Sequence, residues 1–195
     1  MGRSHRRAGY SRPAQHLSRW RRSAAAIIRS RHALSPTVAD LNAMPESQAT
    51  ALLRESCGSS RWVAGMVARR PFGSREAVLD AADDIAQSLD ASDWHEAFAH
   101  HPRIGEQTKS SWAAREQSGA SVATGDVRQA LADVNRDYEQ RFGYIYIVCA
   151  TGKSAEEMLG IAKSRLRNDP ETELRVAAEE QRKITRLRLQ KLLEE

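Results

Sequence analysis

Apolar side chains recur every three to four residues from about Met44 to the C-terminus, the spacing that places them on one face of an α-helix. Proline and glycine interrupt this pattern at several points, so it divides into separate segments. It predicts helices over residues 49–56, 62–70, 75–89, 93–99, 110–119, 124–142, 154–168 and 170–195.

Capping residues support three of these helix starts. Ser74 has the position of an N-cap residue, and Ser154 has the capping-box spacing to Glu157. Asp169 supplies a cap directly before Pro170 at the first helical position. Only residues 144–149 have the composition of a strand, and they lack the partners that a sheet requires. The sequence therefore predicts an all-α protein, a single-domain helical bundle.

Charge is distributed unevenly along the chain. All 25 acidic residues lie from Asp40 onward, whereas nine of the 30 basic residues, all of them arginines, precede Asp40. The remaining 21 basic residues face 25 acidic ones, so the net charge from Asp40 onward is −4. A folded part with this charge lacks the basic surface typical of nucleic-acid binding, and no nucleic-acid partner is expected for it.

The arginine-rich start predicts a basic tail that ends near Ser35-Pro36. We expect a disordered tail over residues 1–36 and a helical domain over residues 37–195. An acid-free start rich in arginine and serine is also typical of an organelle transit peptide, and this alternative stays open.

The two cysteines give no sign of a structural cross-link. Cys57 and Cys149 lie 92 positions apart without a CxxC partner, so neither a disulfide framework nor a zinc ligand set is indicated. A reducing compartment follows as the simpler interpretation. The longest apolar run near the N-terminus, residues 24–28, is too short for a signal-peptide core or a membrane span. We therefore predict a soluble, cytoplasmic protein with no membrane partner.

Two motifs of known chemistry are incomplete. The sequence H-E at His95 begins the zinc motif H-E-x-x-H, but position 99 is alanine. A looser site with His100 and His101 is disfavoured, because adjacent side chains on a helix point about 100° apart. Residues 151–154 resemble the end of a phosphate-binding loop, yet Ile147 stands where its first glycine is required. Neither a metal nor a nucleotide is expected.

His101 is the strongest candidate for chemistry. It precedes Pro102 in the sequence H-P-R-I-G, and a residue before proline avoids the helical region, so the helix should end there. The ring of Pro102 then stiffens the backbone that carries the imidazole. Glu116 and Gln117 on the next predicted helix add an ionisable group and an amide, as a small polar heterocycle requires. A purely structural histidine stays the alternative.

From about Leu41 onward the chain resembles the 2-oxo-4-hydroxy-4-carboxy-5-ureidoimidazoline (OHCU) decarboxylases. The resemblance rests on blocks in the family's order that cover about four-fifths of the chain: L-N-x-M, C-G-S-S-R-W, R-P-F, W-H-E-A-F-A-H-H-P-R-I-G-E, R-E-Q-S-G, Y-x-x-R-F-G-Y-I-Y-I-V-C-A-T-G-K-S, R-L-x-N-D-P and K-I-T-R-L-R-L. It implies an all-α fold, usually a homodimer, that converts OHCU to S-allantoin and carbon dioxide in urate degradation without a metal or cofactor.

The resemblance also implies a set of site residues. It places the catalytic histidine at His101, with Glu116 and Arg188 as further catalytic groups. It implies that the backbone of a strand-like stretch lines the ligand pocket, which gives its free amides and carbonyls a use. The implied substrate-binding residues are Pro102, Ala113, Gln117, Tyr146, Ile147, Val148, Cys149 and Ala150.

Ala113 departs from the pattern of the family, which commonly has serine three residues before the glutamate. One hydroxyl contact is then missing or comes from Ser110 or Ser111. The loss of one hydrogen bond weakens binding by roughly 0.5 to 1.5 kcal/mol without removing the chemistry. A related ureido compound as the substrate therefore stays open.

A mechanism follows as a hypothesis. Loss of carbon dioxide leaves an electron pair that the imine and carbonyl groups of the substrate itself can delocalise. His101, with a near-neutral pKa, would deliver a proton to one face of the ring carbon, and Arg188 would hold a carboxylate or carbonyl oxygen. The rival hypothesis is a helical binding module that uses its arginine tail on nucleic acid or an anionic surface.

Overall fold

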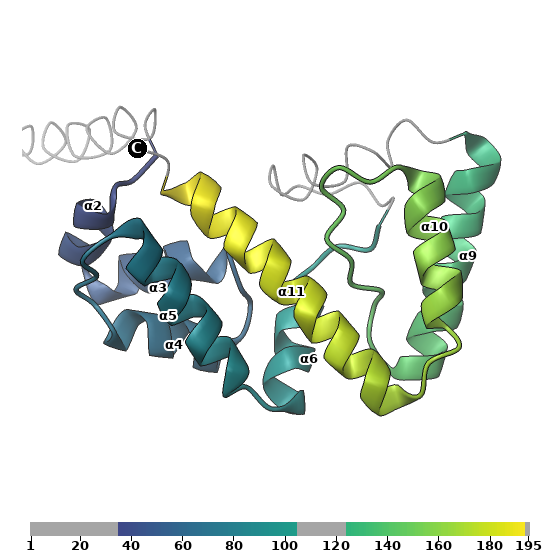
Figure 1. The fold of residues 1–195 in the computed structure, drawn as a ribbon, viewed down its shortest axis with the longest axis horizontal. Coiled ribbons are helices and arrows are strands. Elements are labelled where there is room, and N and C mark those ends of the chain that lie inside the picture. The colour runs from purple at the N-terminus through teal and green to yellow at the C-terminus, as the bar shows by residue number, and fades with distance from the viewer. Residues whose placement is uncertain (1–34, 105–123, 194–195) are drawn as a thin grey trace, which may run out of the picture. The chain divides into compact units, whose positions relative to one another are not determined.

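The computed structural model describes residues 35–104 and 124–193 of the chain. Within these two ranges the chain forms helices and no strand, as predicted (Figure 1). None of the described helices combines the length and the apolar character that crossing a membrane requires. The helices are α2 (Val38–Ala43), α3 (Glu46–Arg54), α4 (Ser60–Ala68), α5 (Arg75–Gln87), α6 (Ala91–Ala99), α9 (Gly125–Phe142), α10 (Ala155–Arg165) and α11 (Pro170–Leu192).

The predicted helix starts are confirmed by their caps. The side chains of Ser74 and Asp169 accept hydrogen bonds from first-turn amides of α5 and α11. Ser154 and Glu157 form both hydrogen bonds of the predicted capping box at α10. Each cap satisfies an amide that the helix itself leaves without a partner, which fixes where the helix begins.

Helix α2 was not predicted, because its six residues are too few for a periodic pattern. A signal was nevertheless present at its start. Thr37 and Asp40 form a capping box, in which each side chain accepts a hydrogen bond from the other residue's amide. The helix is short but well anchored, since Leu41 is fully buried in the core.

Helix α11 is the element against which the site is built. It packs against α5 and α6, while α9 pairs with α10, and in Figure 1 α11 passes between these two groups of helices. Apolar residues at helical spacing on α5, α6 and α11 fill the core. Trp62 of α4 is 1% exposed, and its indole Nε1 donates to the Ala82 carbonyl at 3.1 Å. Aromatic burial of this kind is a major source of stability.

Residues 144–150, here called the wall segment, follow α9 and form neither a helix nor a paired strand. They are buried except for Ile145, which is partly exposed. The prediction that these residues have the composition of a strand but belong to no sheet is therefore confirmed within the described residues. The wall segment must satisfy its backbone polar groups with side chains, because no neighbouring strand is described.

A buried network of charged and polar side chains supports the wall segment. Arg165 at the end of α10 donates through Nε to Glu173 Oε1 at 2.8 Å, and the Tyr138 hydroxyl donates to the same oxygen. Asn168 Nδ2 donates to the other carboxylate oxygen at 2.7 Å. A second guanidinium nitrogen of Arg165 donates to the Ile147 carbonyl at 2.8 Å. The network joins α9, α10 and α11 to the wall segment.

Candidate active site

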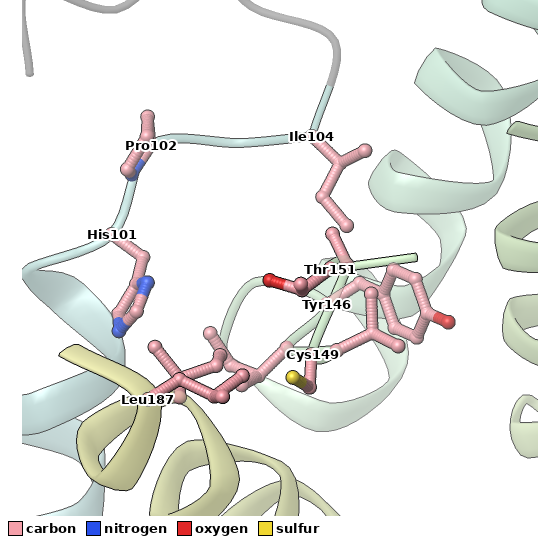
Figure 2. Close-up of a pocket in the computed structure, with 11 residues that line it drawn as sticks. His101, Pro102, Ile104, Tyr146, Cys149, Thr151 and Leu187 are labelled. Carbon is pink, nitrogen blue, oxygen red and sulfur yellow. The ribbon is translucent and has the colours of Figure 1, made fainter. Parts of the chain in front are cut away.

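A pocket of about 460 Å³, open solvent included, lies between the end of α6, the wall segment and α11. Figure 2 shows His101 and Pro102 on one side of it, with Tyr146, Cys149 and Thr151 on the opposite side. The described residues that line it are His101, Pro102, Ile104, Tyr146, Ile147, Val148, Cys149, Ala150, Thr151, Ile184 and Leu187.

The end of α6 determines where His101 lies. The helix begins at a capping box between Asp90 and Asp93 and ends at the cap residue His100. The amide of His101 still donates to the Phe98 carbonyl at 3.1 Å, after which Pro102 leaves the helix. The predicted break is confirmed, and it places the imidazole in the pocket (Figure 2).

Gly58, in the loop between α3 and α4, allows a close approach to this helix end. A Cβ atom at Gly58 would lie 2.4 Å from His100 Cβ and 2.9 Å from His100 Cγ. Neither atom is the far end of a flexible side chain, so the backbone on one side must move. The residue that follows His100 is the candidate catalytic histidine.

Replacing Gly58 by alanine is therefore expected to lower both stability and activity. Overpacking of this kind costs about 1 to 3 kcal/mol in the free energy of unfolding, and a displaced His101 should lower kcat/KM at least about tenfold. Gly73→Ala is the matched control, because a Cβ there meets nothing within 4 Å. Urea unfolding measures the first effect, and the rate of the reaction that the family resemblance implies measures the second. Equal activity in both variants would show that the contact does not position His101.

The electrostatic environment keeps His101 neutral. Burial, followed by the charges of Arg188 and His100, lowers the pKa of His101 to about 3, while hydrogen bonding with Gln181 acts in the opposite direction. The near-neutral pKa expected from the sequence is therefore wrong for this structure. Although the residue is partly exposed, its Nε2 atom is buried and has no hydrogen-bond partner among the described residues.

Three buried polar residues of α11 form a stripe on the helix near the end of α6. Gln181, Thr185 and Arg188 are each at most 6% exposed, and they share a helical face through their spacing of four and three residues. Gln181 Nε2 donates to Thr185 Oγ1 at 3.2 Å, and Arg188 donates to the Glu55 carbonyl at 3.2 Å. Arg188 does not line the pocket itself, but its charge acts on His101.

The backbone of the wall segment is only partly available to a ligand. The carbonyl of Ile147 accepts a hydrogen bond from Arg165. The amide of Cys149 donates to Glu180 Oε2 at 2.8 Å, and the Cys149 carbonyl accepts from Lys153 Nζ at 2.7 Å. The expectation that the backbone groups of this segment are free for a ligand is therefore wrong for the Ile147 carbonyl and for the amide and carbonyl of Cys149.

The structure thus places eight of the eleven site residues expected from the sequence in one region. His101, Pro102 and residues 146–150 line the pocket, and Arg188 lies beside it. Ala113, Glu116 and Gln117 lie outside the described residues. In the described ranges no three histidine, cysteine or acidic side chains are grouped as a metal site requires.

Several residues of the site were not predicted from the sequence. Ile104, Ile184 and Leu187 line the pocket but have the pattern of ordinary core positions. Gln181 was also missed, although its spacing from the apolar positions of α11 predicts the same buried face. A polar residue on an apolar helical face was the available signal.

Comparison with known proteins identifies the family. The family model for OHCU decarboxylase matches residues 42–190. The uric acid degradation bifunctional protein TTL of Arabidopsis thaliana is 42% identical over 144 residues, which are 70% of this chain and 44% of that protein. The chain thus spans less than half the length of this relative.

Two further comparisons agree. The 2-oxo-4-hydroxy-4-carboxy-5-ureidoimidazoline decarboxylase of Amia calva is 27% identical over 132 residues, 64% of this chain and 75% of that protein. A crystal structure of OHCU decarboxylase in the presence of (S)-allantoin superimposes with a TM-score of 0.68 at 33% identity, and the match covers 78% of this chain and all of that one. The family model covers most of the chain, so this protein belongs to the OHCU decarboxylase family.

Proposed function

We propose that this chain catalyses the decarboxylation of OHCU to S-allantoin in urate degradation, as a carboxy-lyase. Membership of the family supports the reaction. In this chain, the observation that supports the reaction is that His101 lines a small pocket and that its buried Nε2 atom has no hydrogen-bond partner among the described residues. A buried polar atom without a partner is costly, and a polar ligand would satisfy it.

In this proposal the substrate supplies its own electron sink. The bond to the carboxylate breaks, carbon dioxide leaves, and the electron pair moves into the adjacent imine and carbonyl system. His101 then delivers a proton to one face of the ring carbon, which sets the S configuration. A substrate carboxylate near His101 would raise its pKa, because negative charge favours the imidazolium.

The remaining roles are assigned by chemistry. Arg188 offers a planar fork of donors for a carboxylate or for an oxygen that gains negative charge. Glu116 would orient His101 or the substrate, and Gln117 would both donate and accept at the ring edge. Ala113 provides no hydroxyl. No metal or cofactor is part of the proposal.

We also propose a homodimer in the cytoplasm. Homodimers are the usual form of the family that the chain resembles, and symmetric pairs are the most common oligomers. Cys57 and Cys149 are both free and buried, which fits a reducing compartment.

The test is circular dichroism of freshly generated OHCU with and without the purified protein. The proposal expects a rapid S-allantoin signal, ahead of the slow spontaneous decay to racemic product. Heat-inactivated protein is the control. A folded protein that gives no acceleration would contradict the proposed reaction and favour a related ureido compound as the substrate.

A further inference from the structure

Charged side chains hold one edge of the wall segment. Arg165 donates to the Ile147 carbonyl at 2.8 Å, Glu180 accepts from the Cys149 amide at 2.8 Å, and Lys153 donates to the Cys149 carbonyl at 2.7 Å. The partners come from α10, from α11 and from the turn after the wall segment. In place of a neighbouring strand, these side chains satisfy three successive polar groups of one edge.

Peptide geometry determines what the opposite edge presents. In a planar trans peptide the C=O and N–H bonds point in opposite directions. With its carbonyl directed to Arg165, Ile147 turns the amide of Val148 away from Arg165. With its amide directed to Glu180, Cys149 likewise turns the carbonyl of Val148 away. The structure shows no hydrogen-bond partner for either group of Val148 among the described residues.

The amide and carbonyl of Val148, which have no hydrogen-bond partner within residues 35–104 and 124–193, belong to the pocket wall. Val148 lines the pocket with its neighbours and is 5% exposed, so its amide and carbonyl have little access to bulk water. Buried backbone groups without partners are rare in folded proteins. Their position at the site indicates that a ligand completes them.

We propose that Glu180 is a positioning residue, which fixes the plane of the Val148–Cys149 peptide so that Val148 can hydrogen-bond the substrate. This role rests on the proposed function of the pocket. Glu180 does not touch the substrate in this proposal. It acts through the Cys149 amide.

The surroundings of Glu180 suit this role. Its second carboxylate oxygen accepts from Lys183 Nζ at 2.6 Å, so both oxygens are held. Burial alone would raise the pKa of Glu180, but the hydrogen bonds from Lys183 and Cys149, with the charges of Lys183 and Lys153, lower it overall. The carboxylate therefore remains an acceptor at neutral pH.

The turn after the wall segment supplies the third contact. The amide of Lys153 donates to the Ala150 carbonyl at 3.0 Å, and Gly152 has a φ of +79°. Glycine adopts this left-handed conformation without the steric penalty that other residues meet. The turn brings Lys153 back to the Cys149 carbonyl, so both polar groups of Cys149 are held by charged side chains.

The test compares Glu180→Ala with Glu180→Gln in the full-length protein. Alanine removes the acceptor, and kcat/KM should fall about tenfold, mainly through a higher KM, because the affected contact binds substrate before and during the reaction. The glutamine amide keeps an oxygen that can accept from Cys149, so Glu180→Gln should stay within about threefold of the original protein.

Glu179→Ala is the matched control. Glu179 is the preceding residue of α11, is exposed and pairs with Arg182 at 2.8 Å, away from the wall segment. Its removal should leave kcat/KM unchanged. Equal thermal unfolding midpoints for Glu179→Ala and Glu180→Ala would separate positioning from a general loss of stability.

Amide hydrogen exchange of Cys149 gives a readout that does not require turnover. Loss of its acceptor in Glu180→Ala should speed its exchange at least about tenfold, while Glu179→Ala should not. If the unaltered protein decarboxylates OHCU and Glu180→Ala retains full kcat/KM, the positioning role is wrong. If the unaltered protein has no activity, the proposed function fails, and the exchange rate of Cys149 decides alone whether Glu180 fixes this peptide.

Discussion

His101→Asn is expected to abolish turnover of OHCU while leaving the fold intact. Asparagine has no imidazole nitrogen that can take up and release a proton, so the proton delivery assigned to His101 is lost. General acid–base catalysis contributes about 100- to 10,000-fold, and kcat should fall by at least that lower limit. The loss of stability should be small, because asparagine keeps both a donor and an acceptor for the hydrogen bonding with Gln181. Circular dichroism measures both product formation and unfolding.

His100→Asn is the control for this prediction. It keeps the Cβ atom that faces Gly58 and lies one residue from the candidate catalytic group, but its exposed side chain does not line the pocket. Activity near that of the original protein is expected. Substantial S-allantoin formation by His101→Asn would remove the imidazole from the proposed mechanism and leave Glu116 as the candidate acid.

The sequence was a good guide to the helices because the signals for helices are local. A helix start is marked by each of Ser74, Ser154 and Asp169, because each side chain accepts a hydrogen bond from an amide in the first turn of the helix that follows it. The break before Pro102 likewise depends on two adjacent residues. Helix α2 was not predicted because its six residues are too few for a periodic pattern, and the capping box at its start is the only local signal. The burial of Leu41, which holds this helix, depends on the tertiary fold.

The site was predictable only where chemistry and family resemblance coincide. His101 and residues 146–150 were predicted and line one pocket. The partners of the wall segment were not predicted, since Arg165 and Glu180 lie 18 and 31 residues from the groups that they bind. The prediction of a near-neutral pKa for His101 was also wrong. The pKa depends on burial and on Arg188, which lies 87 positions away in the sequence, and not on the H-P-R-I-G motif.

Glu173→Ala is expected to cause the largest loss of stability. Glu173 is fully buried, and its carboxylate accepts from Arg165, Tyr138 and Asn168. Burial raises the pKa of Tyr138, so its hydroxyl stays protonated and can donate. Removing the carboxylate leaves the buried guanidinium of Arg165 without its counter-charge, and breaking such a pair costs about 3 to 5 kcal/mol in the free energy of unfolding.

The control is Glu171→Ala, two residues earlier on the same helix. Glu171 pairs with Arg175 at 3.3 Å, but its side chain is 83% exposed, and exposed pairs contribute at most about 1 kcal/mol. Urea unfolding should therefore separate the two variants clearly. A loss below about 1 kcal/mol in Glu173→Ala would mean that water or a rearranged side chain replaces the carboxylate.

The double variant Arg165→Met with Glu173→Leu tests whether this ion pair serves the stability of the fold or the position of the wall segment. Replacing a buried ion pair by apolar side chains of similar volume is often neutral for stability, so the double variant should recover much of the loss. It also removes the donor to the Ile147 carbonyl, and the wall segment would lose one of the contacts that orient its backbone. Recovered stability with kcat/KM still reduced at least about tenfold is the expected result. Full recovery of both would mean that the network stabilises the fold and that the wall segment keeps its position without Arg165.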